Sequence, residues 1–158
     1  MPQLIILVGN IGSGKSTLVQ EYIKKGYIVI SRDSLRYGIG GGQYKFDYDL
    51  EPVIWETELT MFKLFLLLGK NIIIDEVGIS KLMRKRYLDI VRLPFYPNYS
   101  VICIEMPKLS RKEAIDRRMK DPHGQPDRQI WEDVWEKFNN QYETPTKEEG
   151  FNKIIRKI

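Results

Sequence analysis

A glycine-rich loop carrying a lysine and a serine lies near the start of the chain. Residues 9–17 read GNIGSGKST and fit the pattern G-x-x-x-x-G-K-[ST] between an apolar run and a segment of helical spacing. Glycines let backbone amides face a phosphate chain, and the helix N-terminus adds partial positive charge. A plain glycine turn would leave Lys15 and Ser16 unexplained. The residues predicted to bind a nucleoside triphosphate are Gly9, Asn10, Gly12, Ser13, Gly14, Lys15, Ser16 and Thr17.

Within this loop, Lys15 and Ser16 have separate expected tasks. We expect the Lys15 ammonium to reach the β- and γ-phosphates and to act in catalysis, and the Ser16 hydroxyl to bind Mg²⁺. Two carboxylates, Asp75 and Glu76, follow the apolar run Ile72–Ile74. In this position Asp75 is predicted to hold Mg²⁺ through its water shell, and Glu76 to position a water molecule. The alternative is a solvated acidic strand end.

Asp33 decides the predicted type of reaction. It lies in the stretch Ser31-Arg32-Asp33-Ser34-Leu35-Arg36, directly after another apolar run. A carboxylate there can accept the proton of a hydroxyl group that attacks the γ-phosphate. Arg36, one helical turn further on, is suited to holding a phosphate of the acceptor. The plainer alternative is that Asp33 or Ser34 caps a helix and Arg36 is solvated.

Short apolar runs alternate with segments of helical spacing along the whole chain. The predicted strands are Leu4–Val8, Tyr27–Ile30, Ile72–Ile74, Val101–Ile104 and Phe151–Ile158. The predicted helices cover 16–26, 49–68 with Asp49 as N-cap, 80–92 from Ser80, 110–120 from a Ser110–Glu113 capping box, and 127–142. This alternation predicts an α/β domain with a parallel sheet and helices on both faces. Ligands bind such sheets at the carboxyl ends of the strands.

Two further segments bear on the acceptor. Arg111–Lys120 is a basic helix that runs into Asp121-Pro122-His123-Gly124. It is interpreted either as a lid that neutralises charge on the transferred phosphoryl group or as a solvated basic face, with His123 at the surface of the lid or loop. Residues 37–48 interleave glycines and aromatic rings, which either stack an exposed base or pack the loop onto the domain.

Composition excludes several other kinds of chemistry. Cys103 is the only cysteine and His123 the only histidine, so disulfide scaffolds, zinc cages and serine–histidine nucleophiles are excluded. The net charge of +4 suits a phosphate-bearing partner without identifying one. Met1–Gln3 shows no leader pattern, and the longest later apolar stretch, Leu64–Leu68, is too short to span a bilayer. These features predict a cytoplasmic protein without a membrane partner.

The phosphate loop, Ser31–Arg36, the strand that ends at Asp75 and the late segment Tyr142-x-x-Pro145-Thr146-x-x-Glu149-Gly150-Phe151 resemble the kinase domain of the polynucleotide 5′-hydroxyl kinases over nearly the whole chain. The resemblance implies a P-loop kinase fold with a helical lid, here one domain over 1–158 with its lid at about 117–128. It implies ATP as donor, Mg²⁺ as cofactor and the 5′-OH end of DNA or RNA as acceptor. An end-healing phosphatase or a ligase on a separate chain is the implied partner.

The resemblance also implies roles for single residues. Asp33 becomes the general base, Arg36 and Arg32 bind the acceptor, and Ser16 and Asp75 bind the metal. A lid arginine contacts the transferred phosphate, and both Arg117 and Arg118 fit that position. Glu76 departs from the family pattern and receives no role. The same residues also fit a nucleotide or small-metabolite kinase, and Asp75-Glu76 fits a nucleotide-hydrolysing switch.

Overall fold

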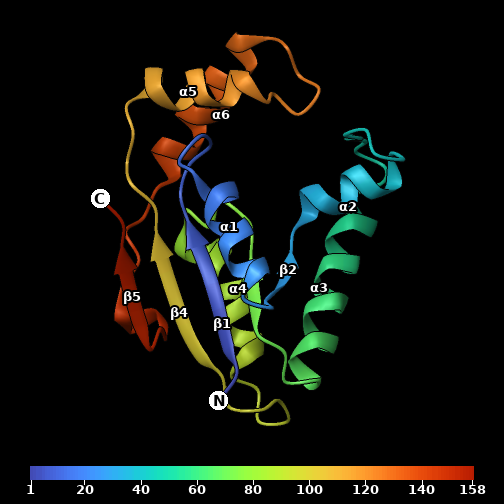
Figure 1. Cartoon of the computed structure of the whole chain (residues 1–158), viewed down its shortest axis with the longest axis vertical. Helices are drawn as coiled ribbons and strands as arrows, with labels where there is room; N and C mark the ends of the chain where they lie inside the picture. Colours follow the sequence, from blue (N-terminus) through green and yellow to red (C-terminus); the bar gives the residue numbers. More distant parts are fainter.

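Five parallel strands form the centre of the molecule, and a computed structural model describes all 158 residues. The strands are β1 (Gln3–Val8), β2 (Ile28–Ile30), β3 (Ile72–Ile74), β4 (Ser100–Glu105) and β5 (Lys153–Arg156). They lie in the order β2-β3-β1-β4-β5, and every neighbouring pair is parallel (Figure 1). The predicted α/β class with a parallel sheet is therefore confirmed. The central strand β1 leads directly into the glycine-rich loop.

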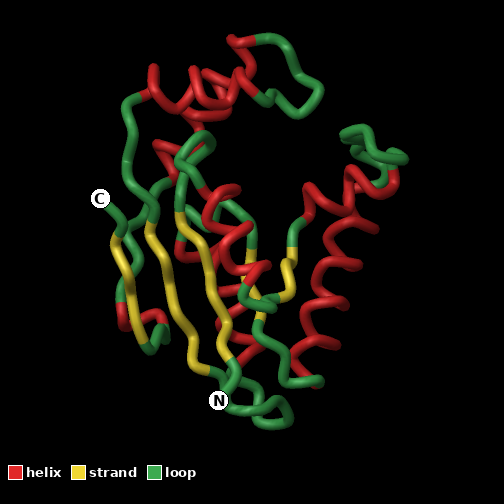
Figure 2. The backbone as a smooth tube through the Cα atoms, viewed as in Figure 1, coloured by secondary structure: helices red, strands yellow, loops and turns green.

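Six helices and one short 3-10 turn connect and cover the strands. They are α1 (Lys15–Lys24), α2 (Arg32–Ile39), α3 (Glu51–Leu67), α4 (Lys81–Val91), α5 (Arg111–Lys120), α6 (Arg128–Gln141) and η1 (Lys147–Glu149). Figure 2 shows α5 and α6 above the carboxyl ends of the strands, and α2 with α3 along the β2 side. Because the strands are parallel, the loops that follow β1, β2, β3 and β4 all lie at the carboxyl edge of the sheet.

Alternating side chains of β1 build two cores, one on each face of the sheet. Leu4, Ile6 and Val8 belong to a cluster of 15 buried residues that includes residues of α3 and α4. Ile5 and Leu7 belong to a smaller cluster that includes residues of α1. Because a strand buried on both faces has no polar side, β1 reads as an unbroken apolar run. Helices therefore cover both faces, as predicted.

Helix boundaries follow the predicted caps except at two places. The side chains of Ser80, Ser110 and Asp127 each accept a hydrogen bond from a first-turn amide, so α4, α5 and α6 begin where expected. Asp49 is not the cap of α3, because Leu50 takes that position without a side-chain bond. The predicted helices also include none over 32–39, although the alternative for this stretch was a helix capped by Asp33 or Ser34. The structure has this helix, α2, but its cap is Ser31, which accepts a bond from the Ser34 amide.

The last strand is shorter than predicted, because β5 covers Lys153–Arg156 within the expected range 151–158. It pairs only with β4 and so forms one edge of the sheet. None of the helices has the length and apolar character needed to cross a lipid bilayer.

Candidate active site

The glycine-rich loop curls tightly between β1 and α1. Gly12 and Gly14 have φ angles of 72° and 96°, which L side chains rarely adopt. A Cβ on Gly12 would lie 2.2 Å from the carbonyl oxygen of Ala114 in α5, so the loop and the helix touch backbone to backbone. Gly14 also serves as the N-cap of α1. The loop therefore directs the N-terminus of α1 toward the carboxyl edge of the sheet, where anions are favoured.

The Lys15 ammonium lies inside this curled loop. Its Nζ donates hydrogen bonds to the carbonyl oxygens of Gly9 at 2.7 Å and Asn10 at 2.9 Å. Burial lowers the pKa of Lys15 to about 8, although the charge of Asp75 acts in the opposite direction. The Lys15 ammonium is buried and binds mainly neutral carbonyl oxygens. An anionic ligand is favoured here, because phosphate oxygens would bind the ammonium more strongly than these carbonyl oxygens do. The predicted phosphate-binding residues form a cradle that fits this ligand.

Asp75 follows β3 and faces the same space. Burial raises the pKa of Asp75, while the nearby Lys15 ammonium lowers it. A half-buried carboxylate at this edge favours a cation, and the exposed Ser16 at the start of α1 adds a hydroxyl oxygen. The structure has no group of three or more acidic, histidine or cysteine side chains that could cage a metal. A site with one carboxylate and one hydroxyl fits Mg²⁺, which keeps several of its waters.

Glu76 points to α2 and binds Arg32. The backbone amide of Arg32 donates to Glu76 Oε1 at 2.8 Å, and its Nη2 donates to Oε2 at 3.2 Å. The Arg32 guanidinium also stacks over the Trp55 ring at 3.7 Å. Burial raises the pKa of Glu76 to about 7, against the lowering effect of Arg32. Arg32, predicted to bind the acceptor, is thus placed as a bridge from α2 to the end of β3 and to α3.

Asp33 lies in the first turn of α2 with one oxygen held and one free. Its Oδ1 accepts hydrogen bonds from Arg36 Nη1 at 2.7 Å and from the Tyr44 hydroxyl at 3.0 Å. Its side chain is 44% exposed, and no hydrogen bond to Oδ2 is made. The Oδ2 atom is therefore available to an incoming hydroxyl group. Lys15, Asp33 and Asp75 follow β1, β2 and β3 at the same edge of the sheet, and the charge of Asp33 acts to raise the pKa of both Lys15 and Asp75.

Arg36 is held between two carboxylates. Besides Asp33, it donates from Nε and Nη2 to both oxygens of Glu51 at 3.1 Å and 2.5 Å. These bonds raise the pKa of Arg36 despite the opposing effect of burial. Its predicted contact with an acceptor phosphate stays a prediction. In the structure Arg36 fixes the orientation of Asp33, with Glu51 of α3 as its support.

The two candidate lid arginines occupy different places. Arg117 Nη1 is 3.9 Å from the position of a Cβ on Gly14, beside the phosphate loop. Arg118 is more buried, and its charge influences the pKa values of Lys15 and Asp75. Burial lowers the pKa of Arg118, with the charge of Asp33 acting in the opposite direction. Both arginines thus approach the site, Arg117 over the loop and Arg118 toward the carboxylates.

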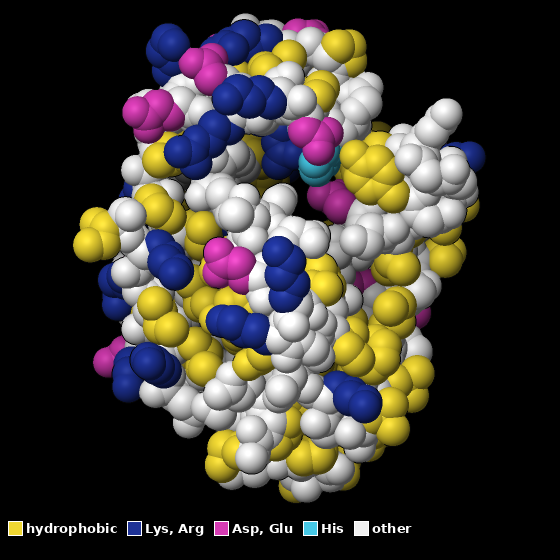
Figure 3. All heavy atoms as spheres, viewed as in Figure 1, with side chains coloured by type: hydrophobic (Ala, Val, Ile, Leu, Met, Phe, Trp, Pro, Cys, Tyr) yellow, Lys and Arg dark blue, Asp and Glu magenta, His cyan; other side chains and the backbone are white.

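A hollow separates the lid from α2 at the surface. The only histidine, cyan in Figure 3, lies at the rim of this hollow with acidic side chains on either side. The hollow gives solvent a path toward the carboxyl edge of the sheet.

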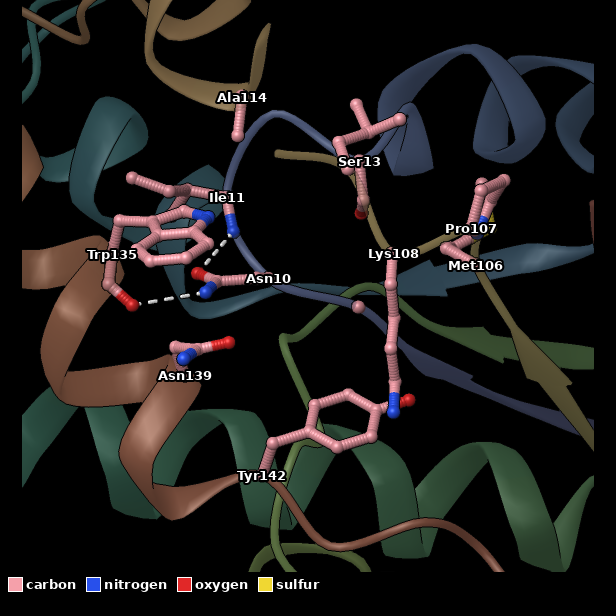
Figure 4. Close-up of a pocket in the computed structure, with 12 residues that line it drawn as sticks. Asn10, Ile11, Ser13, Met106, Pro107, Lys108, Ala114, Trp135, Asn139 and Tyr142 are labelled. Carbon is pink, nitrogen blue, oxygen red and sulfur yellow. Dashed lines mark hydrogen bonds between the residues drawn. The ribbon is translucent and has the colours of Figure 1, made fainter. Parts of the chain in front are cut away.

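A separate cavity of about 230 Å³ lies on another side of the phosphate loop. Figure 4 shows Trp135 and Asn139 beside Asn10 and Ile11, and Tyr142 next to Lys108. The Asn10 amide donates to the Trp135 carbonyl oxygen at 3.0 Å, which ties the loop to α6. Lys15, Asp33 and Asp75 do not line this cavity. The cavity is lined by Gly9, Asn10, Ile11, Ser13, Met106, Pro107, Lys108, Leu109, Ala114, Trp135, Asn139 and Tyr142.

The late segment 142–151, which is part of the family resemblance, is linked to the site through Glu149. Glu149 accepts two hydrogen bonds from the fully buried guanidinium of Arg84, at 2.8 Å and 3.1 Å. Arg84 also donates to the Gly78 carbonyl oxygen in the loop after β3. In turn, the Val77 carbonyl oxygen accepts a bond from the Gly9 amide. Arg84 and Glu149 therefore link the end of the chain to the loops that hold Asp75 and the phosphate cradle.

Four residues of this site lie outside the sequence-based candidates: Glu51, Tyr44, His123 and Arg84. No motif marks Glu51, which meets Arg36 only because α3 packs against α2. Tyr44 lies in the aromatic segment 37–48 and His123 in the lid segment, but the sequence does not show that both lie near Asp33. The sequence likewise does not mark Arg84 as a buried arginine.

Most of the chain matches a known protein family. Residues 4–145 match a family profile described as an AAA domain, AAA_33. The chain belongs to this AAA domain family. The glycine-rich loop and the parallel sheet of this chain form a P-loop kinase fold, and this fold implies nucleotide binding.

Solved structures agree with this fold. A chain of the Pnkp1/Rnl/Hen1 RNA repair complex has a TM-score of 0.67 at 19% identity, covering 89% of this chain and 45% of that one. A fungal RNA kinase has a TM-score of 0.64 at 15% identity, covering 98% and 74%. A gluconokinase from Sinorhizobium meliloti 1021 has a TM-score of 0.57 at 17% identity, covering 98% and 81%. This AAA domain chain thus spans less than half the length of the Pnkp1-complex chain and shares the P-loop kinase fold with all three.

Proposed function

We propose that the chain is an ATP-dependent polynucleotide 5′-hydroxyl kinase. The observation that carries the proposal is Asp33, whose Oδ1 accepts hydrogen bonds from Arg36 and Tyr44 while its Oδ2 accepts none, at the same edge of the sheet as Lys15 and Asp75. A nucleotide-binding switch has no use for an oriented carboxylate on the far side of the phosphate cradle. A phosphotransferase with a hydroxyl acceptor does need one.

The proposed reaction uses side chains at the carboxyl edge of the sheet. The acceptor oxygen forms a bond to the γ-phosphorus while the bond from that phosphorus to the β–γ bridging oxygen breaks, releasing ADP. The proton of the acceptor hydroxyl passes to Asp33 Oδ2. Lys15 and a lid arginine stabilise the charge that spreads over the phosphoryl oxygens. Ser16 and Asp75 would hold Mg²⁺, which when bound neutralises phosphate charge during transfer.

Two observations favour a nucleic acid as the acceptor. The chain resembles the polynucleotide kinases in four separate segments, from the phosphate loop to Phe151. Similar folds include chains of an RNA repair complex and a fungal RNA kinase. A phosphatase or ligase that acts on the same ends belongs to this proposal as a partner. Residues 1–158 would then supply the phosphotransfer step, with the lid at about 117–128.

A small-metabolite kinase is the second candidate. It is favoured by the likeness to a gluconokinase, which covers 98% of this chain. The hydrolytic alternative has less support, because both oxygens of Glu76 accept hydrogen bonds from Arg32. Glu76 therefore makes a structural contact with Arg32 and does not position a free water molecule.

The test is phosphate transfer from γ-labelled ATP to a panel of acceptors. The panel contains 5′-OH DNA and RNA oligonucleotides, the same oligonucleotides with a 5′-phosphate, nucleosides and sugar acids such as gluconate. Label on the 5′-OH oligonucleotides alone supports the proposal, and label only on a small molecule supports the second candidate. Release of free phosphate without any labelled acceptor would favour the hydrolytic alternative.

The matched variants for this test are Asp33→Asn and Asp47→Asn. Asp33→Asn keeps the shape of the side chain but removes its basicity, and we expect about 10²–10⁴-fold slower transfer with ATP binding retained. Asp47 is a loop carboxylate whose Oδ1 accepts the Asp49 amide, outside the group around Lys15. Asp47→Asn should transfer phosphate at the wild-type rate.

A further inference from the structure

His123 connects the lid to the acceptor side of the cleft. It follows α5 in the turn Asp121-Pro122-His123-Gly124 and has a φ of 49°, the only positive φ at a residue other than glycine. Such a conformation is uncommon for a histidine and persists when surrounding contacts impose it. Those contacts therefore indicate what the residue does.

The rings around His123 come from both sides of the cleft. Tyr37 of α2 and Tyr44 of the following loop lie 5.9 Å and 5.8 Å from the imidazole, measured between ring centroids. Trp131 of α6 lies 6.3 Å away on the lid side. Tyr44 is also the residue that donates to Asp33 Oδ1. The imidazole thus fills the space between the lid and the segment that positions the proposed base.

The two nitrogens of His123 face groups of opposite character. Its Nε2 lies 2.8 Å from Arg118 Nη1, and its Nδ1 lies 3.9 Å from Asp33 Oδ2. An arginine can only donate, so Nε2 must accept this hydrogen bond. In a neutral imidazole with an accepting Nε2, the proton is on Nδ1, the nitrogen that faces Asp33. The contacts therefore select one tautomer.

The charges around His123 keep the ring neutral. Arg118 and Asp121 face it from the α5 side, Asp33, Tyr37 and Tyr44 from the acceptor side, and α6 contributes only the uncharged Trp131 ring. Burial lowers the pKa of His123, Arg118 lowers it further, and the two aspartates act against them. A protonated ring would lose the hydrogen bond from Arg118 and place two cations in contact.

We propose that neutral His123, with its proton on Nδ1, is a positioning residue that joins the lid arginine to the catalytic carboxylate. A small inward movement of the lid turns the 3.9 Å separation into a hydrogen bond from Nδ1 to Asp33 Oδ2, leaving the second lone pair of that oxygen for the acceptor proton. Closure over the phosphates and orientation of the base then occur in one movement. This inference rests on the proposed function of Asp33.

The first test reads the tautomer directly and needs no substrate. His123 is the only histidine, so ¹⁵N-histidine labelling of a protein without a histidine tag gives one pair of ring nitrogens in an NMR spectrum. We expect the proton on Nδ1 and an unprotonated Nε2 at pH 7.5, and loss of this single tautomer in Arg118→Ala. A proton on Nε2, or a mixture of tautomers as in free histidine, would overturn the proposal.

The second test separates positioning from packing. His123→Phe keeps an aromatic ring at the same φ but has no ring nitrogen, while His123→Asn offers an acceptor and a donor and tolerates a positive φ. We expect kcat to fall about 10- to 100-fold in the Phe variant, with an unchanged KM for ATP, and to recover largely in the Asn variant. The Tm of the Phe variant should fall slightly, because phenylalanine disfavours a positive φ. Wild-type kcat in the Phe variant would show that the ring only packs.

Lys137→Ala is the matched control, because Lys137 is an exposed lysine of α6 with no ion pair in the structure. It should leave kcat unchanged. The pH profile gives a third readout: the His123→Asn variant should lack the loss of kcat that protonation of His123 causes in the wild type at low pH. If the wild type transfers phosphate to no acceptor, the proposed function is wrong. The NMR experiment still tests the tautomer of His123, because it does not depend on activity.

Discussion

The guanidinium of Arg36 donates from Nη1 to Asp33 Oδ1 over 2.7 Å, one turn apart on the same helix. This bond alone would leave Arg36 free to rotate about its long side chain. The two additional bonds from Arg36 to Glu51 prevent that rotation. The orientation of the proposed base therefore depends on a glutamate that touches no substrate.

The first prediction concerns Glu51→Gln. The amide can accept only one of the two charge-assisted bonds from Arg36, so Asp33 should be oriented less well. We expect kcat for phosphate transfer to fall roughly tenfold, equivalent to about 1.4 kcal/mol, with the ATP dissociation constant unchanged. The matched control is Glu56→Gln, an exposed position on the same helix. Equal rates for both variants would contradict the role of Glu51.

The second prediction separates the two lid arginines. Arg118 lies near the carboxylates, so Arg118→Ala should lower kcat by about 10²–10³-fold, the cost of losing one donor to a developing charge. Arg117 lies beside Gly14 at the loop, so Arg117→Ala should mainly raise the KM for ATP. Steady-state kinetics of both variants distinguish the assignments. The opposite pattern would exchange the two roles.

The third prediction uses the contact between the phosphate loop and α5. Gly12→Ala places a methyl group 2.2 Å from the Ala114 carbonyl oxygen, at a φ that alanine disfavours. Calorimetry should show ATP binding weakened by at least about tenfold. Gly38→Ala is the control, because a Cβ there meets nothing within 4 Å in a helix. That variant should bind ATP normally and gain up to about 1 kcal/mol of stability.

The fourth prediction concerns the ion pair between Arg84 and Glu149. Removing Arg84, which is fully buried, leaves a carboxylate without its partner, so Arg84→Ala should cost about 3–5 kcal/mol in the free energy of unfolding. Lys85→Ala removes an exposed pair on the same helix and should cost less than about 1 kcal/mol. Urea unfolding of the two variants gives the comparison.

The same pair gives stability a definite pH dependence. Its hydrogen bonds lower the pKa of Glu149 from the ordinary value of 4.5, against the effect of burial. A carboxyl group with a lower pKa in the folded state stabilises the protein above its unfolded pKa, and this contribution is lost as the pH falls through the folded pKa. Wild-type stability should therefore decline below about pH 4.5. In Arg84→Ala this part of the decline should be smaller.

The fifth prediction concerns Cys103, which is buried in β4. Burial raises the pKa of this thiol to about 12, so almost no thiolate forms at neutral pH. A thiol reagent at pH 7.5 should label the folded protein hardly at all and label it fully in denaturing urea. Rapid labelling of the native protein would indicate that the edge strand β5 separates from β4.

Whether the sequence predicts a feature of this protein depends on how close together in the chain the residues that form the feature lie. The phosphate loop, the buried strands and three helix caps depend on residues within a few positions of one another, so their patterns predict the parallel sheet and the cradle around Lys15. Helix α2 has only eight residues, and none of them is fully buried. The stretch after Ser31 therefore predicted chemistry, and its helix was named only in the alternative in which Asp33 or Ser34 is a cap.

Partners that meet only through tertiary packing could not be predicted. Arg36 and Glu51 are separated by 15 residues, and Arg84 and Glu149 by 65. Arg32 illustrates the difficulty, since its type and position suit an acceptor phosphate while its guanidinium lies on Trp55 and Glu76. Which of several suitable partners a charged side chain takes is decided by how the helices pack, and spacing in the sequence contains little of that information.

The rings around His123 have a consequence for how a nucleic acid end would enter. Tyr37, Tyr44, His123 and Trp131 shield one another while the lid and the acceptor segment are in contact. Any separation of the two sides bares aromatic faces on both walls at the same moment. An unpaired terminal base stacks on such faces in a sequence-independent way. The movement that would open the entrance would therefore also expose the aromatic rings on which an unpaired terminal base can stack.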